Sequence, residues 1–154
     1  MQPRWHILWG FVFSYLTAYF FHLSLPYFLI LFLSTWFFID LDHVVLYILE
    51  TKNFHPRKFL EHHAIEKSQR SSLSEEEKLK QEFPHFFLHG IEFLILLIIL
   101  SFLNETFLFI LIGFLFHLIL DCICMFHDEE NILFKLSQTY TYIKNKKAKK
   151  LRIT

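Results

Sequence analysis

Four long apolar stretches, separated by short breaks or polar segments, dominate the chain. Each is close to the ~20 residues that a helix needs to cross the ~30 Å hydrocarbon core of a bilayer. They cover residues 5–22, 27–49, 84–103 and 106–127. Very short breaks separate the first from the second stretch and the third from the fourth. The pattern predicts an all-α, integral membrane four-helix bundle with two tight turns on one side.

Two segments are polar instead. Residues 51–83 carry Lys, Glu and Ser runs and predict a loop with some amphipathic helix. Residues 131–154 predict an amphipathic, basic tail whose end we expect to fray. We therefore expect a membrane domain over residues 1–130, including the loop, followed by the tail. The first apolar stretch has no small-residue cleavage site, so we expect no cleavable signal peptide.

Composition supports membrane insertion. The chain is 54% hydrophobic, with 21 Phe and only 3 Gly among 154 residues. A soluble domain of this length could not easily bury so much apolar surface. The expected partner is therefore the lipid bilayer, and the net charge of zero gives no indication of a nucleic-acid partner.

The basic residues predict the orientation. With four spans, the amino terminus, the 51–83 loop and the tail share one side of the membrane. All 15 Lys and Arg fall on that side, and neither short turn contains any. By the positive-inside rule that side is the cytoplasm. We expect a multi-pass protein of the cell membrane with both termini cytoplasmic.

The apolar stretches contain titratable residues that are costly to insert. A charged group at mid-span costs about 2.5–3.5 kcal/mol, so such residues normally face the bundle interior and serve a function. The set comprises His6, Asp40, Asp42, His43, His85, His89, Glu92, His117 and Asp121. At about 1.5 Å of rise per residue, most of them fall in one layer near the cytoplasmic face.

Their spacing suits shared ligation. His117 and Asp121 are four residues apart on one helical stripe, and Gly113 precedes them by four, which favours close helix approach. His89 and Glu92 have the i, i+3 spacing of metal sites in helical bundles. Imidazole with carboxylate suits a divalent transition metal, of which we expect Zn, with Mn or Fe as alternatives. More than four ligands would permit two metal ions.

Other interpretations remain open. His117 and Asp121 could form a helix–helix hydrogen bond, and the Asp40–His43 group could pair with a loop cation. His6 and His85 could reach the membrane interface instead of a metal. Cys122 and Cys124 are expected to be packing residues. The same polar layer could serve an ion- or proton-conducting transporter, for which a homodimer could supply the moving parts. Alternatively, it could only specify helix packing in a structural membrane protein.

Three motifs resemble a known family. FIDLDHVV at 38–45, HGIE at 89–92 and GFLFHLILD at 113–121 resemble the inner-membrane-associated metal-dependent hydrolases of bacteria and archaea. The resemblance covers about residues 1–125. Ile39 and Gly90 depart from it, because many members have Pro and Ser at those places. A more distant likeness is to zinc-dependent phospholipase C and related helical nucleases.

The resemblance implies a hydrolase and a set of roles. The metal would be held by Asp42, His43, His89, His117 and Asp121, with His6 as a further ligand. It would lower the pKa of a water molecule, and Glu92 or Asp40 would act as the general base. The position near the inner leaflet favours a phosphoester substrate, such as a lipid headgroup.

Overall fold

The computed structural model describes residues 3–74, 77, 80–127 and 133–153, and these form helices without any strand. The helices are α1 (Pro3–Phe21), α2 (Leu25–Ser34), α3 (Phe37–Thr51), α4 (Pro56–Ser71), α6 (Ile91–Ser101), α7 (Glu105–His127), α8 (Leu133–Leu136) and α9 (Gln138–Ile153). The all-α prediction is confirmed. The predicted boundary between residues 130 and 131 lies outside the described residues.

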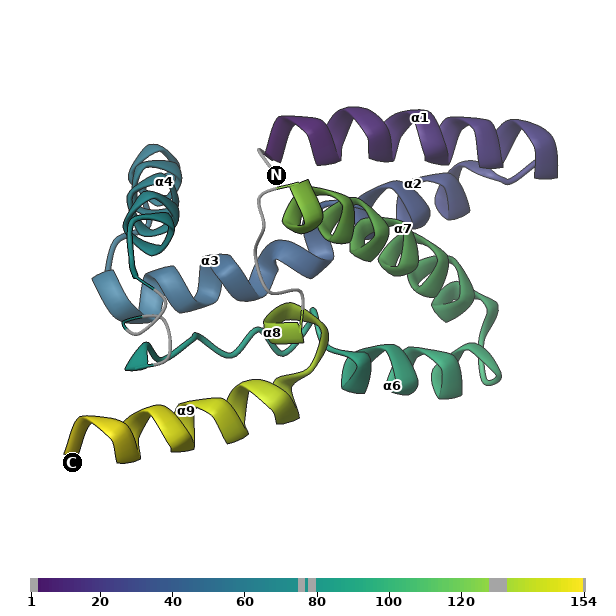
Figure 1. Cartoon of the computed structure of the whole chain (residues 1–154). Coiled ribbons are helices and arrows are strands. Elements are labelled where there is room, and N and C mark those ends of the chain that lie inside the picture. The colour runs from purple at the N-terminus through teal and green to yellow at the C-terminus, as the bar shows by residue number, and fades with distance from the viewer. Residues whose placement is uncertain (1–2, 75–76, 78–79, 128–132, 154) are drawn as a thin grey trace.

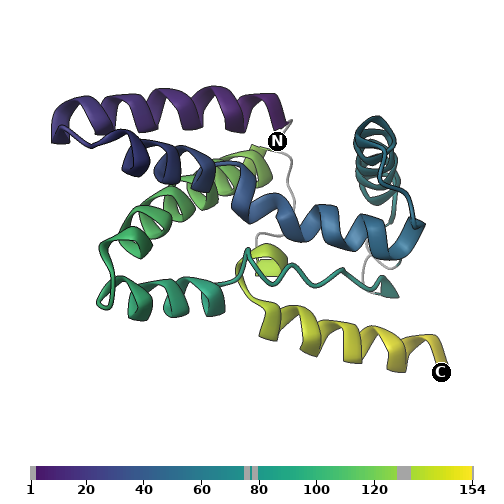
Figure 2. The same cartoon turned by 180° about the vertical axis from the view of Figure 1, so that it is seen from behind.

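Helix α7 forms the centre of the apolar half. It packs most extensively against α2 and α6, and α1 covers both α2 and α7 (Figures 1 and 2). The buried core includes Phe114 and Leu118 of α7, together with Ile39 of α3 and Leu97 of α6. The Tyr27 hydroxyl also donates a hydrogen bond to the Glu105 carboxylate, joining the starts of α2 and α7.

The second predicted span is broken. Helices α2 and α3 meet at an angle of 43°. Helix α2 ends where the hydroxyls of Ser34 and Thr35 donate hydrogen bonds to the carbonyls of Ile30 and Phe32. Such local bonds from Ser and Thr side chains to the preceding turn commonly bend helices. The break leaves the backbone around residue 35 available to neighbouring helices.

The third predicted span is shorter than expected. Residues 81–90 are not helical, and α6 begins only at Ile91, with Gly90 as its N-cap. Pro84 explains part of this, because proline disfavours the helical conformation of the residue before it. The prediction of a continuous helix over 84–103 is therefore wrong. His89 lies in a turn, so it does not share a helix face with Glu92.

Small residues allow α1, α2 and α7 to approach closely. A Cβ atom added at Gly113 would lie 2.5 Å from the Cβ of Ser34 and 2.9 Å from the carbonyl oxygen of Leu31. One added at Gly10 would lie 2.2 Å from the Thr35 hydroxyl oxygen. The close helix approach predicted at Gly113 is therefore present.

We expect Gly113→Ala to destabilise the fold by about 1–3 kcal/mol, because overpacking at a backbone contact forces helices apart. Thermal unfolding in detergent measures the effect. Leu115→Ala is the control, since Leu115 lies on the same helix with 41% of its surface exposed. Equal melting temperatures for the Gly113 variant and the wild type would contradict the tight α2–α7 contact.

The polar segments form helices beyond the apolar half. Helix α4 lies across the far end of α3, and α9 runs from the start of α6 away from the apolar helices (Figure 1). The expected fraying of the tail is wrong for α9, which buries Thr141, Asn145 and Ala148 on one face. The Asn145 side chain holds residues 81–90, because it accepts a hydrogen bond from the Phe83 amide and donates one to the Phe83 carbonyl.

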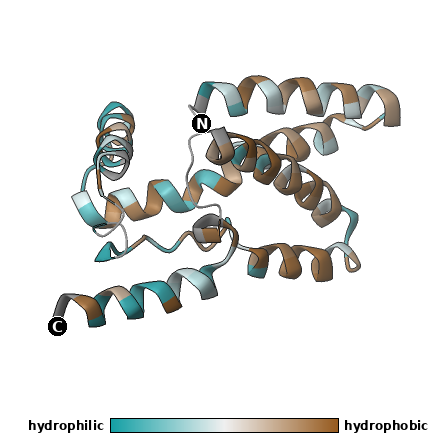
Figure 3. Ribbon diagram, viewed as in Figure 1, coloured by the Kyte–Doolittle hydropathy of each residue, from teal (hydrophilic) through white to brown (hydrophobic). Residues whose placement is uncertain are grey.

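Apolar side chains cover much of the outer surface. Among the described residues, α7 is the single helix long and apolar enough to span a membrane, and the bent α2–α3 pair passes the same test when taken together. Helix α6 is apolar but short. Large side chains are exposed along α1, for example Leu8 at 48% and Phe20 at 70%. Hydrophobic residues concentrate in the half formed by α1, α2, α6 and α7 (Figure 3).

Candidate metal centre

Histidines and aspartates from four parts of the chain meet where the apolar half ends. His6 comes from α1, Asp40, Asp42 and His43 from α3, His89 from the turn before α6, and His117 and Asp121 from α7. Figure 1 shows these segments converging near the start of α3. His89 and His117 are 0% exposed, and His6, Asp42 and Asp121 are also buried. The structure thus brings together all the expected ligands.

Two carboxylates face two imidazoles at the centre of this cluster. The Nε2 atom of His117 lies 3.4 Å from Oδ2 of Asp121 and 3.7 Å from Oδ1 of Asp40. The Nε2 atom of His89 lies 3.8 Å and 3.5 Å from the same two oxygens. Each carboxylate therefore faces both rings.

His6 extends the cluster on one side. Its Nε2 atom lies 3.4 Å from Oδ1 of Asp121. Its ring stacks on the ring of His117, with centroids 4.5 Å apart. His6 approaches the carboxylate oxygen that His89 and His117 leave open, so Asp121 is shared among three imidazoles.

The backbone at the helix break orients His117. Its Nδ1 atom lies 3.0 Å from the carbonyl oxygen of Thr35. A carbonyl can only accept, so Nδ1 carries a proton, and in the neutral imidazole this leaves the Nε2 lone pair facing the carboxylates. Metal-binding histidines are commonly fixed in this way by a carbonyl or carboxylate. Sequence reasoning missed the role of Thr35, because a side-chain motif does not reveal a carbonyl freed by a bend.

Asp42 orients His89. Its Oδ2 atom lies 3.1 Å from Nδ1 of His89 and accepts a hydrogen bond of 3.0 Å from the Leu88 amide. A carboxylate on Nδ1 fixes the tautomer and leaves Nε2 for a ligand. Asp40, which was expected to be a general base, faces the Nε2 atoms of both histidines. Asp42, an expected ligand, contacts His89 at Nδ1 instead.

His43 lies beside this group. Its ring contacts those of His89, Phe86 and His63, at centroid distances of 4.8, 4.0 and 5.0 Å. Asp40, His43 and His89 offer ligand atoms that all lie within 4.8 Å of one another. The contact with His63 of α4 was not predicted, since nothing in the sequence shows that α4 folds back onto α3.

Glu92 and His85 have other partners. The Glu92 carboxylate accepts hydrogen bonds from the amides of Gln138 and Thr139 and from the hydroxyls of Ser137 and Thr139. It therefore caps the positive end of α9, a stabilising place for an anion. These contacts argue against the expected general-base role of Glu92. His85 lies 3.4 Å from the side-chain nitrogen of Asn145 and is part of the same α9 contact.

The four separations at the centre, 3.4–3.8 Å, are longer than hydrogen bonds, and two of them, at 3.4 and 3.5 Å, match the spacing of atoms that bind one metal ion. Nitrogen–oxygen hydrogen bonds are about 2.7–3.2 Å long. Two atoms that bind one ion at about 2.0–2.2 Å in tetrahedral geometry lie about 3.3–3.6 Å apart. The Nε2 atom of His117 is buried and has no hydrogen bond among the described residues. The donors therefore fit a divalent ion that would occupy the space between them.

The ligands fall into two groups of three. One comprises His6, His117 and Asp121, and the other Asp40, His43 and His89, with ligand atoms within 4.8 Å in each. Asp40 and Asp121 also face a histidine of the opposite group. These groups could hold a metal ion through imidazole and carboxylate donors. Cys122 and Cys124 are each partly buried and are not joined in a disulfide.

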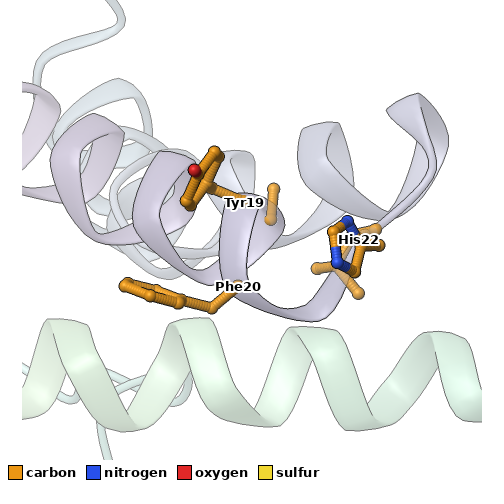
Figure 4. Close-up of a pocket in the computed structure, with 5 residues that line it drawn as sticks. Tyr19, Phe20 and His22 are labelled. Carbon is orange, nitrogen blue, oxygen red and sulfur yellow. The ribbon is translucent and has the colours of Figure 1, made fainter.

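A cavity of about 580 Å³ lies elsewhere, at the turn between α1 and α2. It is lined by Ala18, Tyr19, Phe20, His22 and Leu23, and Figure 4 shows Tyr19 and Phe20 pointing to different sides of α1. His6 is at the other end of that helix. The cavity contains one imidazole and no carboxylate, so it lacks the chemistry found at the cluster.

The chain matches no protein-family model, no curated protein and no solved structure. Function is therefore inferred from the motifs and from the geometry of the cluster.

Proposed function

We propose that the protein is a multi-pass membrane protein with both termini in the cytoplasm. Support comes from the exposed apolar side chains on α1, α6 and α7, because patches of this extent indicate a lipid or protein partner. It also comes from the one-sided distribution of Lys and Arg. A reporter fused after Thr154 is expected to be active only inside the cell; activity only outside would contradict this orientation.

We further propose that the cluster of histidines and aspartates is a centre for two divalent ions, with Zn the best match to its ligands. His6, His117 and Asp121 would hold one ion, and Asp40, His43 and His89 the other. Asp42 and the Thr35 carbonyl fix the rings of His89 and His117. The observation that carries this proposal is that both carboxylates face His89 and His117 at 3.4–3.8 Å.

The activity that this centre supports best is hydrolysis of a phosphoester at the cytoplasmic face of the membrane. Divalent ions held there would supply Lewis acidity and favour deprotonation of water near neutral pH. The side chain of Asp40 is 35% exposed, whereas His89 and His117 are fully buried. Asp40 therefore marks the side from which water and a substrate reach the ligands. This position, at the end of the apolar half, favours a substrate such as a lipid headgroup.

Hydrolysis can be tested with purified protein, Zn²⁺ or Mn²⁺, and phospholipid vesicles that carry phosphomonoester headgroups. We expect phosphate release that Asp121→Ala lowers by at least about a hundredfold, since loss of a metal-centred contact removes a leading electrostatic contribution to catalysis. His22→Ala, at the α1–α2 turn, is the control. Metal-loaded protein that releases no phosphate from any such headgroup would contradict the activity while leaving the metal centre intact.

A further inference from the structure

A second group of potential ligands lies outside the centre, where α4 meets the end of α3. Glu50 belongs to the last turn of α3, and His62 and Glu66 are four residues apart on α4. One ligand atom from each of the three lies within 4.8 Å of the other two. The spacing of His62 and Glu66 places both side chains on the same face of α4.

We propose that Glu50, His62 and Glu66 bind a divalent transition metal ion, Zn²⁺ or Mn²⁺, that fastens α4 to α3. One imidazole with two carboxylates is a donor set that suits both ions. Three protein ligands would leave further positions for water, as in open zinc sites. The site does not depend on whether the first centre holds metal, because the two share no ligand.

Charge supports a cation at this place. Two carboxylates that approach this closely repel each other, so a cation placed between them lowers the energy of the pair. The Nδ1 atoms of His62 and His63 lie 3.8 and 3.7 Å from the same Glu66 oxygen, so both imidazoles already turn toward that carboxylate. A divalent ion would neutralise both carboxylates without requiring a protonated histidine.

A nearby cavity continues the same acidic surface. It has a volume of about 330 Å³ and is lined by Glu50 and Glu66 together with Glu82 and two glutamines. Two of the three proposed ligands thus reach a space that water and ions can occupy. Glu82 also lies 3.7 Å from the Lys149 ammonium of α9, so it is already paired with a cation.

The weak apolar packing of α4 gives the ion a structural role. Phe59 packs against Tyr47 of α3, but Leu60 and Ile65 are 50% and 57% exposed. The apolar residues of α4 therefore do not form one face, and little hydrophobic burial holds the helix. An ion that joins α3 to α4 would fix the position of α4. It would thereby also fix His63 of α4, which contacts His43 of the first centre.

Zn²⁺ binding and hydrogen exchange on the full-length protein test this site. After chelation and titration with Zn²⁺ alone, we expect amides of α4 to gain protection in the wild type and in His117→Ala. The gain in protection should be lost in His62→Ala and in Glu66→Gln. Zn²⁺ affinity at the site should fall at least about tenfold in each variant, because removing even a residue that only supports a metal ligand typically costs about 10–100-fold. Glu61→Gln is the matched control, because Glu61 pairs with Arg57 on the same helix.

The result that would overturn the site is equal protection of α4 in the wild type, His62→Ala and Glu66→Gln at every Zn²⁺ concentration. Failure of the first centre gives a different pattern. In that case His117→Ala binds as much Zn²⁺ as the wild type, while His62→Ala still removes both one equivalent of metal and the protection of α4. Glu50→Gln, on α3, provides a further ligand variant that leaves the sequence of α4 unchanged and is expected to reproduce the loss.

Discussion

His117→Ala is expected to remove most of the metal from the buried centre. The variant deletes the Nε2 atom that lies between Asp40 and Asp121 at 3.7 and 3.4 Å. It also leaves the Thr35 carbonyl without its hydrogen-bond donor. Metal analysis of protein purified without a histidine tag, followed by Zn²⁺ titration, measures the loss.

A structural role for His117 predicts a different result. The variant would then lower stability by about 1–3 kcal/mol, through the unsatisfied Thr35 carbonyl, and leave the metal content unchanged. His22→Ala is a suitable control, because His22 is a histidine at the other end of α1 from the cluster and should change neither quantity. Identical Zn²⁺ affinity in the wild type and His117→Ala would exclude His117 as a ligand.

Asp40→Asn and Asp42→Asn are expected to differ strongly, although the two residues are only two positions apart. Asp40 faces the Nε2 atoms of His89 and His117, so replacement by a neutral amide would remove the negative charge of a proposed ligand. Asp42 contacts His89 at Nδ1, so Asp42→Asn should weaken metal binding by about 10–100-fold, as for other carboxylates that orient a metal-binding histidine.

The comparison is made by competition with a chromophoric chelator, using both variants at the same pH, because metal binding requires deprotonated ligands. Asp40→Asn should lose more affinity than Asp42→Asn. A larger loss in Asp42→Asn would support Asp42 as the ligand and contradict the proposed ligand role of Asp40.

Part of the cluster was predictable because spacing along a helix determines which side chains share a face. His117 and Asp121 are one turn apart on an uninterrupted helix, so their shared direction followed from spacing alone. The close approach at Gly113 followed in the same way. The cost of inserting charged groups into a membrane also made it reasonable to expect these residues to gather inside the bundle.

The roles of Asp40, Asp42 and Glu92 could not be assigned from spacing because each depends on a break in helical structure. The bend between α2 and α3 decides where Asp40 and Asp42 point. The turn at residues 87–90 removes His89 from the face that Glu92 would share with it. Glu92 instead caps α9, a contact across more than 40 residues of sequence that no local pattern reveals.

The docking of the basic tail was missed for a related reason. The lysines of residues 144–150 dominate its composition and indicate a solvated segment. Thr141, Asn145 and Ala148 nevertheless recur at helical spacing, and these are the buried positions. That stripe was visible in the sequence, but its partner, the non-helical segment 81–90, was expected to be part of a loop and a membrane span.

X-ray absorption spectroscopy of the zinc-loaded protein tests the central claim most directly. The measurement is best made on Glu66→Gln protein, so that the proposed site on α4 contributes little to the signal. We expect nitrogen and oxygen ligands at about 2.0–2.2 Å, with the outer-shell scattering of several imidazoles and no sulfur ligand at about 2.3 Å. Protein that binds no Zn²⁺ or Mn²⁺, or a spectrum without imidazole scattering, would contradict a metal centre built from His6, His43, His89 and His117.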